Sequence, residues 1–218
     1  MDKDFVLLQL LSSRLCHDLI GPVGSLSFSM EMLKEDDELE NKEAFDIATS
    51  SVNSLVNRLN YFRVAFGTSN LPEKEIGVIK AKELIFNLFK EKESKIDWYE
   101  SIDEALFKVS NSQNLKLLLN IFLIVFYAVQ KTATIKILAA EMSKGKVGIS
   151  LSIKGSSAKL GIDNIQALKL EVTPQDLTPR NVQSYFTASL AKSLNSNLDV
   201  RDNMQEEIQF AFVLNEKK

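Results

Sequence analysis

Residues 13–24 read SRLCHDLIGPVG. They form the middle of a longer stretch, from Phe5 to Leu33, in which apolar residues recur every three or four positions, as on one face of an amphipathic helix. Pro22 removes one backbone donor from this helix and clashes with the preceding turn, so we expect a kink there. The stretch therefore predicts one long amphipathic helix that carries a histidine, His17, and a proline.

A second amphipathic helix is predicted from about Lys42 to Phe66, after an acidic turn. Its apolar stripe has spacings of three and four and comprises Phe45, Ala48, Val52, Leu55, Leu59, Phe62 and Phe66. Two such helices pair as an antiparallel hairpin, and each covers only part of the other's apolar stripe. We therefore expect two hairpins to form a four-helix bundle, which makes the protein a homodimer.

Beyond a predicted linker at residues 68–72, the period of the apolar residues changes. Helices are predicted at 80–92, 112–130 and 179–194, and strands at 96–99, 105–109, 134–142, 146–154, 198–201 and 208–214. This mixture indicates an α/β sandwich whose mainly antiparallel sheet is covered by helices on one face. The chain is therefore predicted to be an α+β protein with two domains, a helical hairpin at residues 1–67 and a sandwich at residues 73–218.

The composition argues against several classes of function. The net charge of −3 gives no basic field for a nucleic acid. One cysteine and one histidine cannot build a multi-thiolate or imidazole metal site, and they fit a reducing compartment. The first residues lack the cationic region of a signal peptide, and the apolar run 117–129 is shorter than the roughly 20 residues that cross a bilayer. We expect a cytoplasmic protein without membrane or nucleic-acid partners.

His17 is the residue of the first helix with the most reactive side chain. It lies two positions from Leu15 and two from Leu19, away from the centre of the apolar stripe, so its imidazole is predicted to face solvent. An exposed imidazole is largely neutral at neutral pH and has a nitrogen lone pair that can attack phosphorus. The alternative is an ordinary surface histidine without a chemical role.

The residues around His17 strengthen the chemical interpretation. An acid, Asp18, follows the histidine directly, and Pro22 follows it five residues later. This His-acid-x-x-x-Pro arrangement resembles the H-box of two-component sensor histidine kinases, and the wider string at residues 13–24 is similar to the ChpT-type histidine phosphotransferase family. Members of that family have a dimerising helical hairpin followed by a degenerate version of the histidine kinase ATPase domain.

The resemblance implies a function in a bacterial phosphorelay. His17 would accept a phosphoryl group from the receiver aspartate of a hybrid histidine kinase and pass it to the aspartate of one or more response regulators. The magnesium ion for this transfer would be held by the partner's receiver domain.

The sequence departs from the nucleotide motifs of a kinase at three places. Asn120 lies where a paired-asparagine motif is expected, but Ile124 replaces its second member. The two glycine boxes are replaced by KGSSA at residues 154–158 and by TPRN at residues 178–181. We predict no ATP binding and no cofactor or metal bound by this chain, with Asn120 as a structural polar contact. The alternatives are a sensor histidine kinase with divergent nucleotide motifs and a non-catalytic dimeric signalling module.

Residues beside His17 are predicted to take part in transfer or docking. Arg14, one turn earlier, could pair with phosphoryl oxygens or could be a solvated helix charge. Asp18 could orient the imidazole or act as a base. The predicted docking surface comprises Ser13, Ile20, Gly21 and Gly24, whose glycines leave room for an aspartate-bearing loop. Cys16 is expected to be buried beside the apolar seam.

Overall fold

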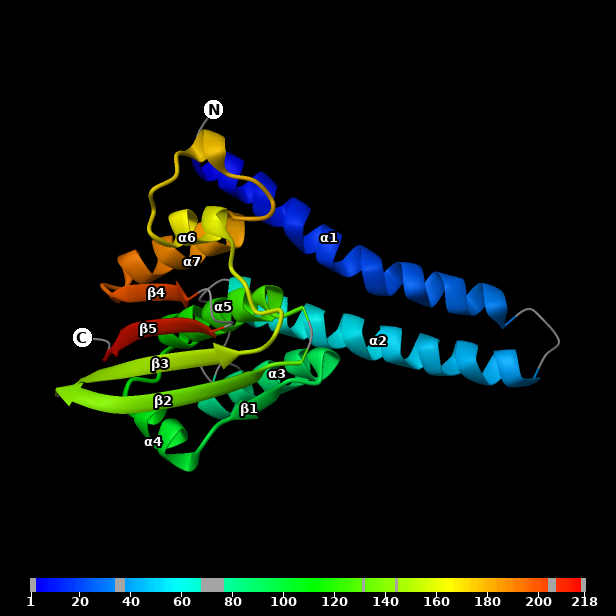
Figure 1. Cartoon of the computed structure of the whole chain (residues 1–218), viewed down its shortest axis with the longest axis horizontal. Coiled ribbons are helices and arrows are strands. Elements are labelled where there is room, and N and C mark those ends of the chain that lie inside the picture. The colour runs from blue at the N-terminus through cyan, green and yellow to red at the C-terminus, as the bar shows by residue number, and fades with distance from the viewer. Residues whose placement is uncertain are drawn as a thin grey trace.

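A long helical hairpin is attached to an α/β body in the computed structural model of this chain (Figure 1). The structure describes residues 3–33, 38–67, 77–130, 132–143, 145–203 and 207–216. The linker predicted at residues 68–72 lies outside these ranges. None of the helices in the described ranges combines the length and the apolar character that a membrane span requires.

The hairpin consists of α1 (Lys3–Met32) and α2 (Glu38–Phe66), so both helices predicted in this region are confirmed. α1 continues through Pro22 without interruption. The two helices lie side by side over the outer part of the hairpin and diverge toward the body (Figure 1). This arrangement leaves the outer faces of both helices open to solvent in the single chain.

The sheet of the body has five strands in the order β1-β2-β3-β5-β4. The strands are β1 (Lys95–Asp97), β2 (Thr134–Ser143), β3 (Lys146–Lys154), β4 (Leu198–Asn203) and β5 (Glu207–Asn215). Only the β1–β2 pair is parallel, and the other pairs are antiparallel. Buried residues alternate with more exposed ones along β3 and β5, because successive side chains point to opposite faces of a sheet. One face therefore belongs to the core and the other is open.

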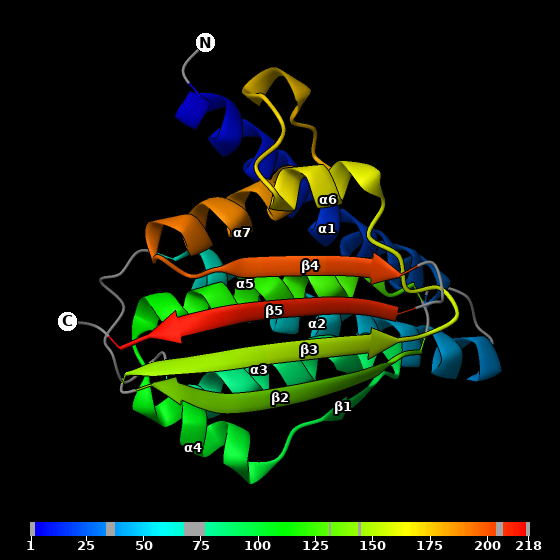
Figure 2. The same ribbon diagram turned by 60° about the vertical axis from the view of Figure 1, so that its left-hand side comes forward.

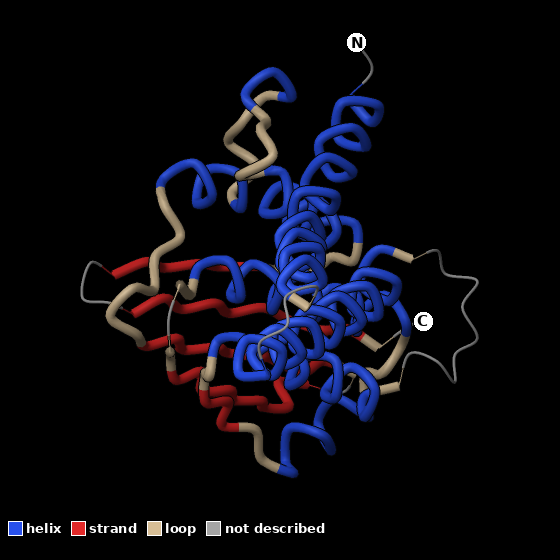
Figure 3. Tube along the Cα trace, turned by 90° about the vertical axis from the view of Figure 1, so that its right-hand side faces the viewer, coloured by secondary structure: helices blue, strands red, loops and turns tan. Residues whose placement is uncertain are grey.

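Helices cover the buried face of the sheet (Figures 2 and 3). They are α3 (Val78–Phe89), α5 (Ser112–Ala128) and α7 (Val182–Ser193), while α4 (Glu100–Lys108) contacts β2 and α6 (Ile162–Leu168) packs on α7. Two short 3₁₀ turns are η2 (Lys90–Lys92) and η3 (Pro174–Asp176). α5 is the central helix, and nearly all of its side chains from Asn114 onward are buried. The predicted α+β class and the sandwich with one covered face are confirmed.

One predicted strand is wrong, and one helix was missed. Residues 105–109 belong largely to α4, whose buried Ile102, Ala105 and Leu106 have the spacing of a helix face. A short apolar run alone does not distinguish a strand from a buried helix, which explains the error. α6 has only seven residues, too few to show a clear period.

Both hairpin helices are anchored in the body. Near the end of α2, Tyr61 is fully buried, and its hydroxyl donates a hydrogen bond to the Leu119 carbonyl at 2.6 Å. The first half of α1 packs on a separate small core through Leu7 and Leu10. That core comprises Ala167, Leu177 and Tyr185. The two predicted domains therefore share a packed contact, and His17 lies on the segment of α1 between that contact and the hairpin turn.

Candidate active site

The His17 side chain is 87% exposed, which confirms the predicted solvent-facing imidazole. Its Nδ1 lies 3.6 Å from Oδ1 of Asp18. This distance is longer than a hydrogen bond, but it is short enough for the carboxylate charge to act on the ring. The other ring nitrogen, Nε2, is the one farther from Asp18. The structure thus presents an accessible imidazole with one nitrogen facing an acid.

The surface around His17 is open and has little side-chain bulk. Ile20 is 67% exposed, and Ser13 is also exposed. A Cβ added at Gly21 or at Gly24 would meet nothing within 4 Å. Packing within this chain therefore does not require either glycine. The docking role predicted for these four residues stays a prediction, and an open face is the geometry that it requires.

Asp18 is turned toward the body. Its side chain is only 9% exposed, and its Oδ2 accepts a hydrogen bond from the Tyr127 hydroxyl. The Arg14 Nε lies 3.5 Å from the same oxygen. Burial raises the pKa of the Tyr127 hydroxyl, and the nearby Asp18 carboxylate raises this pKa further. Tyr127 therefore keeps its proton and remains a hydrogen-bond donor to Asp18.

The structure places Arg14 away from the position predicted for it. Its side chain is only 15% exposed, and its guanidinium stacks on the Tyr127 ring, 4.0 Å from the ring centroid. Its Nη1 donates hydrogen bonds to the carbonyls of Pro179 at 2.7 Å and Arg180 at 3.2 Å. Side chains three positions apart on a helix differ in direction by about 60°. Arg14 therefore points into the body while His17 points to solvent, and the predicted pairing of Arg14 with phosphoryl oxygens stays a prediction.

Cys16 is exposed, so the prediction that it is buried beside the seam is wrong for the single chain. It precedes the exposed Val23 by seven residues, which places both on the same side of α1. A different side of α1, which includes the partly buried Leu15 and Leu19, packs against the main core. The error arose because the apolar stripe of α1 is broad, and the sequence does not specify which side of that stripe faces the rest of the chain.

Arg58 contacts the backbone beside His17, a contact that sequence reasoning missed. In an α-helix the carbonyl of residue 18 accepts from the N–H of residue 22, but Pro22 has no N–H. Arg58 supplies the missing donor, with its Nη1 2.6 Å from the Asp18 carbonyl oxygen. Its Nη2 forms an ion pair with Glu91 at 2.6 Å. The proline in the sequence identifies the carbonyl that needs a donor, but it gives no indication of which residue provides it.

The polar contact predicted for Asn120 is confirmed. The residue is fully buried, and its Nδ2 donates to the carbonyls of Ala65 at 3.0 Å and Lys116 at 2.8 Å. Its Oδ1 accepts a hydrogen bond from Gln183 at 2.9 Å. Both ends of the amide are therefore engaged, and they join α5 to α2 and α7.

The two segments that replace glycine boxes have structural contacts of their own. At Gly155 an added Cβ would lie 3.0 Å from the Ala133 side chain and 3.2 Å from the Thr132 carbonyl, so this glycine is needed for close packing. In the loop at residues 178–181, Asn181 Oδ1 accepts a hydrogen bond from the Thr178 N–H at 2.8 Å. The same loop provides the carbonyls that hold Arg14, and it thereby contacts α1.

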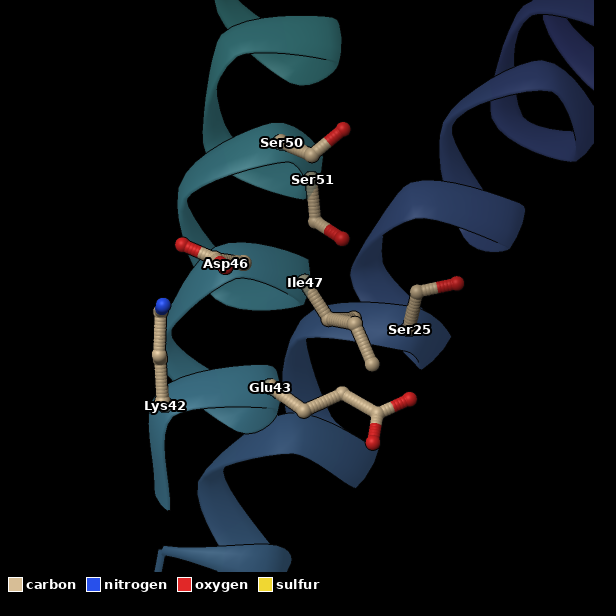
Figure 4. A pocket seen from close by; sticks show the side chains of 7 residues that line it. All are labelled: Ser25, Lys42, Glu43, Asp46, Ile47, Ser50 and Ser51. Atoms are coloured by element: carbon tan, nitrogen blue, oxygen red, sulfur yellow. The ribbon is translucent and has the colours of Figure 1, made fainter. Parts of the chain in front are cut away.

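A cleft of about 600 Å³ lies between α1 and α2 nearer the hairpin turn, and His17 does not line it (Figure 4). Its lining residues are Ser25, Lys42, Glu43, Asp46, Ile47, Ser50 and Ser51. Ser25 follows His17 by eight residues, or about 12 Å along the helix axis. In the described part of the chain, no group of three or more histidine, cysteine, aspartate or glutamate side chains could hold a metal ion. The exposed face around His17, rather than this cleft, is the candidate active site.

The hairpin with its exposed histidine and the attached body define a protein of the phosphotransfer class. The family model of the histidine phosphotransferase C-terminal domain matches residues 79–206, more than half of the 218 residues. The chain therefore belongs to the histidine phosphotransferase family. It is 23% identical over 197 residues to the protein phosphotransferase ChpT of Brucella abortus (strain 2308), and the alignment covers 90% of each chain. The fold is similar to the solved structure of a bacterial phosphotransferase, with a TM-score of 0.76, 23% identity, and coverage of 94% of this chain and 95% of the other.

Proposed function

We propose that His17 is the phosphoryl-accepting residue of this histidine phosphotransferase. The observation that carries the proposal is the exposure of the one histidine in the chain, on a face of α1 that small residues leave open. It would receive the phosphoryl group from the receiver aspartate of a hybrid histidine kinase. It would then pass the group to the aspartate of one or more response regulators.

The transfer is an in-line displacement at phosphorus. The Nε2 lone pair of His17 attacks the aspartyl phosphate, so that the new N–P bond forms as the bond between phosphorus and the carboxylate oxygen breaks. The proton stays on Nδ1, which faces Asp18. The reverse reaction, with a second receiver, releases the phosphoryl group to another carboxylate. We expect this chain to hold no cofactor of its own, and we expect magnesium to be bound by the partner's receiver domain.

The body is proposed to be a degenerate ATPase-like domain that no longer phosphorylates His17 from ATP. Three sites support this proposal, because each position predicted for a nucleotide motif has another contact. Asn120 is engaged by Gln183 and the Ala65 carbonyl, Gly155 packs closely on Ala133, and the loop at residues 178–181 holds Arg14. A polar group engaged in this way cannot bind a metal or nucleotide without first losing its present partners.

The protein is proposed to be a homodimer, because the hairpin has exposed apolar side chains along both helices. They are Phe5, Leu8, Ile20, Val23, Phe28 and Met30 on α1, and Phe45, Val52, Val56 and Leu59 on α2. Phe45, Val52 and Leu59 follow one another at intervals of seven, the spacing of a coiled-coil seam. Full burial of each such side chain contributes roughly 1.5–3 kcal/mol, and a second hairpin in a four-helix bundle would supply that burial. We also propose a cytoplasmic location, with no nucleic-acid or membrane partner.

Two assays test this function. Incubation with labelled ATP alone is expected to leave the protein unlabelled, whereas a phosphorylated receiver domain from the source organism is expected to label it. Replacement of His17 by Gln is expected to abolish this labelling and the relay to a response regulator. Self-labelling from ATP would show a kinase, and relay by the His17→Gln variant would show a non-catalytic module.

A further inference from the structure

Tyr127 links the body to the residue that follows His17. It lies at the end of α5, 109 residues from Asp18, and its hydroxyl donates a hydrogen bond to Oδ2 of that carboxylate. The face of its ring is covered by the Arg14 guanidinium. The Tyr127 side chain is partly buried, and Asp18 lies between it and His17, so Tyr127 does not belong to the open face on which a partner would dock. Its influence on His17 must therefore act through Asp18.

The hydrogen bond determines how Asp18 faces the imidazole. An aspartate beside an exposed histidine on a helix normally has several rotamers available. Here Tyr127 holds Oδ2 and the Arg14 Nε approaches the same oxygen, so only Oδ1 is left to face His17 Nδ1. The Arg58 bond to the Asp18 carbonyl fixes the backbone of the same residue. Both the side chain and the main chain of Asp18 are thus held by groups outside α1.

A fixed carboxylate next to one ring nitrogen selects a tautomer of neutral histidine. The proton is favoured on the nitrogen that faces the negative charge, and the other nitrogen is then left with its lone pair. For His17 this means a proton on Nδ1 and a free Nε2. A free histidine prefers the opposite tautomer, with the proton on Nε2, so the environment has to reverse the ordinary preference.

We propose that Tyr127 is a positioning residue for phosphotransfer: by holding Oδ2 of Asp18, it directs Oδ1 toward Nδ1 of His17 and keeps Nε2 unprotonated for attack on phosphorus. The proposal rests on the proposed role of His17 as phosphoryl acceptor. It gives the body a part in preparing the nucleophile, because Tyr127 belongs to the body and acts on His17 through Asp18.

The tautomer of His17 can be measured directly, since the 218-residue chain contains a single histidine and its ring nitrogens give one unambiguous pair of ¹⁵N signals. The spectrum is recorded at a pH at which the ring is neutral. In the unmodified protein we expect a protonated Nδ1 and an unprotonated Nε2. In Tyr127→Phe the two shifts are expected to move toward those of free histidine, and the rate of transfer from saturating phosphorylated receiver is expected to fall about tenfold, the effect of losing one hydrogen bond.

Tyr61→Phe is the matched control. It also removes one tyrosine hydroxyl, but the hydrogen bond of that hydroxyl goes to the Leu119 carbonyl and not to Asp18. Its ¹⁵N shifts and its transfer rate at saturation are expected to match those of the unmodified protein. Asp18→Asn is the second variant, used if Tyr127→Phe fails to fold, and it is expected to produce the same change of tautomer.

The proposal is overturned if the unmodified protein carries its proton on Nε2. It is equally overturned if folded Tyr127→Phe, or Asp18→Asn in its place, keeps the shifts of the unmodified protein. These outcomes are distinct from a failure of the proposed function, which would appear as phosphorelay by His17→Gln whatever the tautomer of the parent chain.

Discussion

The Arg58 side chain donates a hydrogen bond to the backbone carbonyl of Asp18, the carbonyl that Pro22 leaves without a donor inside its own helix. Pro22 would weaken an isolated helix, but here Arg58 of the neighbouring helix donates the hydrogen bond that the proline cannot. Glu91 holds the other side of the same guanidinium through an ion pair. Three elements of the fold, α1, α2 and η2, therefore meet next to the candidate phosphoryl-accepting residue.

This relationship predicts a measurable coupling between positions 22 and 58. Arg58→Ala should lower the free energy of unfolding by about 2 kcal/mol, because it leaves the Asp18 carbonyl and Glu91 without their partner. In a Pro22→Ala background the loss should be smaller by about 1 kcal/mol, since the backbone N–H restored at position 22 can then donate to the Asp18 carbonyl. Denaturant titrations of the two single variants and the double variant measure this difference. Strict additivity, within about 0.4 kcal/mol, would show that the two positions are independent.

Arg14 is expected to stabilise the folded protein. Arg14→Ala should reduce the free energy of unfolding by roughly 1–3 kcal/mol, because the carbonyls of Pro179 and Arg180 and the Asp18 carboxylate lose a charged partner. Amide hydrogen exchange in the loop at residues 178–181 should become faster. Arg180→Ala is the control, since its side chain is exposed and its carbonyl is kept, so its stability should stay within about 0.5 kcal/mol of the parent. Unchanged stability of Arg14→Ala combined with a loss of transfer would instead favour the original phosphoryl-pairing role.

The raised pKa values of Tyr61 and Tyr127 predict that the folded protein loses stability at alkaline pH. Burial raises the pKa of Tyr61 and of Tyr127 above the ordinary tyrosine value of 10. Below about pH 10 both side chains are neutral in the folded and unfolded chain, and their contribution is complete. Above that pH the unfolded chain loses these protons first, so the free energy of unfolding should fall by up to about 1.4 kcal/mol per pH unit for each tyrosine.

The slope of the free energy of unfolding against pH shows whether these two tyrosines or other groups cause the alkaline loss of stability. Denaturant titrations from about pH 9 to about pH 11.5 should show a shallower slope for Tyr61→Phe and for Tyr127→Phe than for the parent protein. Tyr99→Phe, at an exposed site on the body, is the control and should keep the parent slope. Equal slopes in all four proteins would mean that the two buried tyrosines do not govern the alkaline unfolding.

The exposed apolar side chains of the hairpin predict a homodimer, and a single added charge among them should disrupt it. Val52→Glu and Leu59→Glu place a carboxylate in the proposed helix seam, where burial of an unpaired charge is costly. Sedimentation equilibrium should give a dimer for the parent and a monomer for both variants. Leu138→Glu is the control, because Leu138 is a similarly exposed apolar residue on the open sheet face. A parent protein that sediments as a monomer at high micromolar concentration would exclude the four-helix bundle.

The glycines beside His17 predict opposite effects of small and large side chains. Gly24→Ala should raise the free energy of unfolding by roughly 0.5–1 kcal/mol, because alanine favours helix and its Cβ has open space. Gly24→Phe should leave the fold intact but lower phosphotransfer at least about tenfold, because the ring would occupy the face on which a receiver would dock. Glu104→Phe, an exposed position on α4, is the control for an added aromatic side chain. Normal transfer by Gly24→Phe would place the docking surface elsewhere.

The sequence alone was sufficient for most of the elements of the fold. Local patterns identified these elements: the apolar periods of α1, α2 and α5, and the alternation of β3 and β5. Such patterns can be read from the sequence because helices and strands each have a fixed repeat. The exposure of His17 followed from the same reasoning, because its position relative to Leu15 and Leu19 is fixed within one helix. The misassigned strand at residues 105–109 shows the limit of this approach for short runs.

Only the tertiary structure decided which face of α1 meets the body. Arg14 and His17 are three positions apart, yet the first is largely covered by Tyr127 and the second is in solvent, because the body covers one side of the helix only. The groups that donate hydrogen bonds to Asp18, Arg58 and Tyr127, come from α2 and α5, 40 and 109 residues away. No local period specifies such contacts, since they depend on how separately formed elements pack. The sequence therefore determined the helix and its exposed histidine, while packing determined which side chains hold Asp18 beside it.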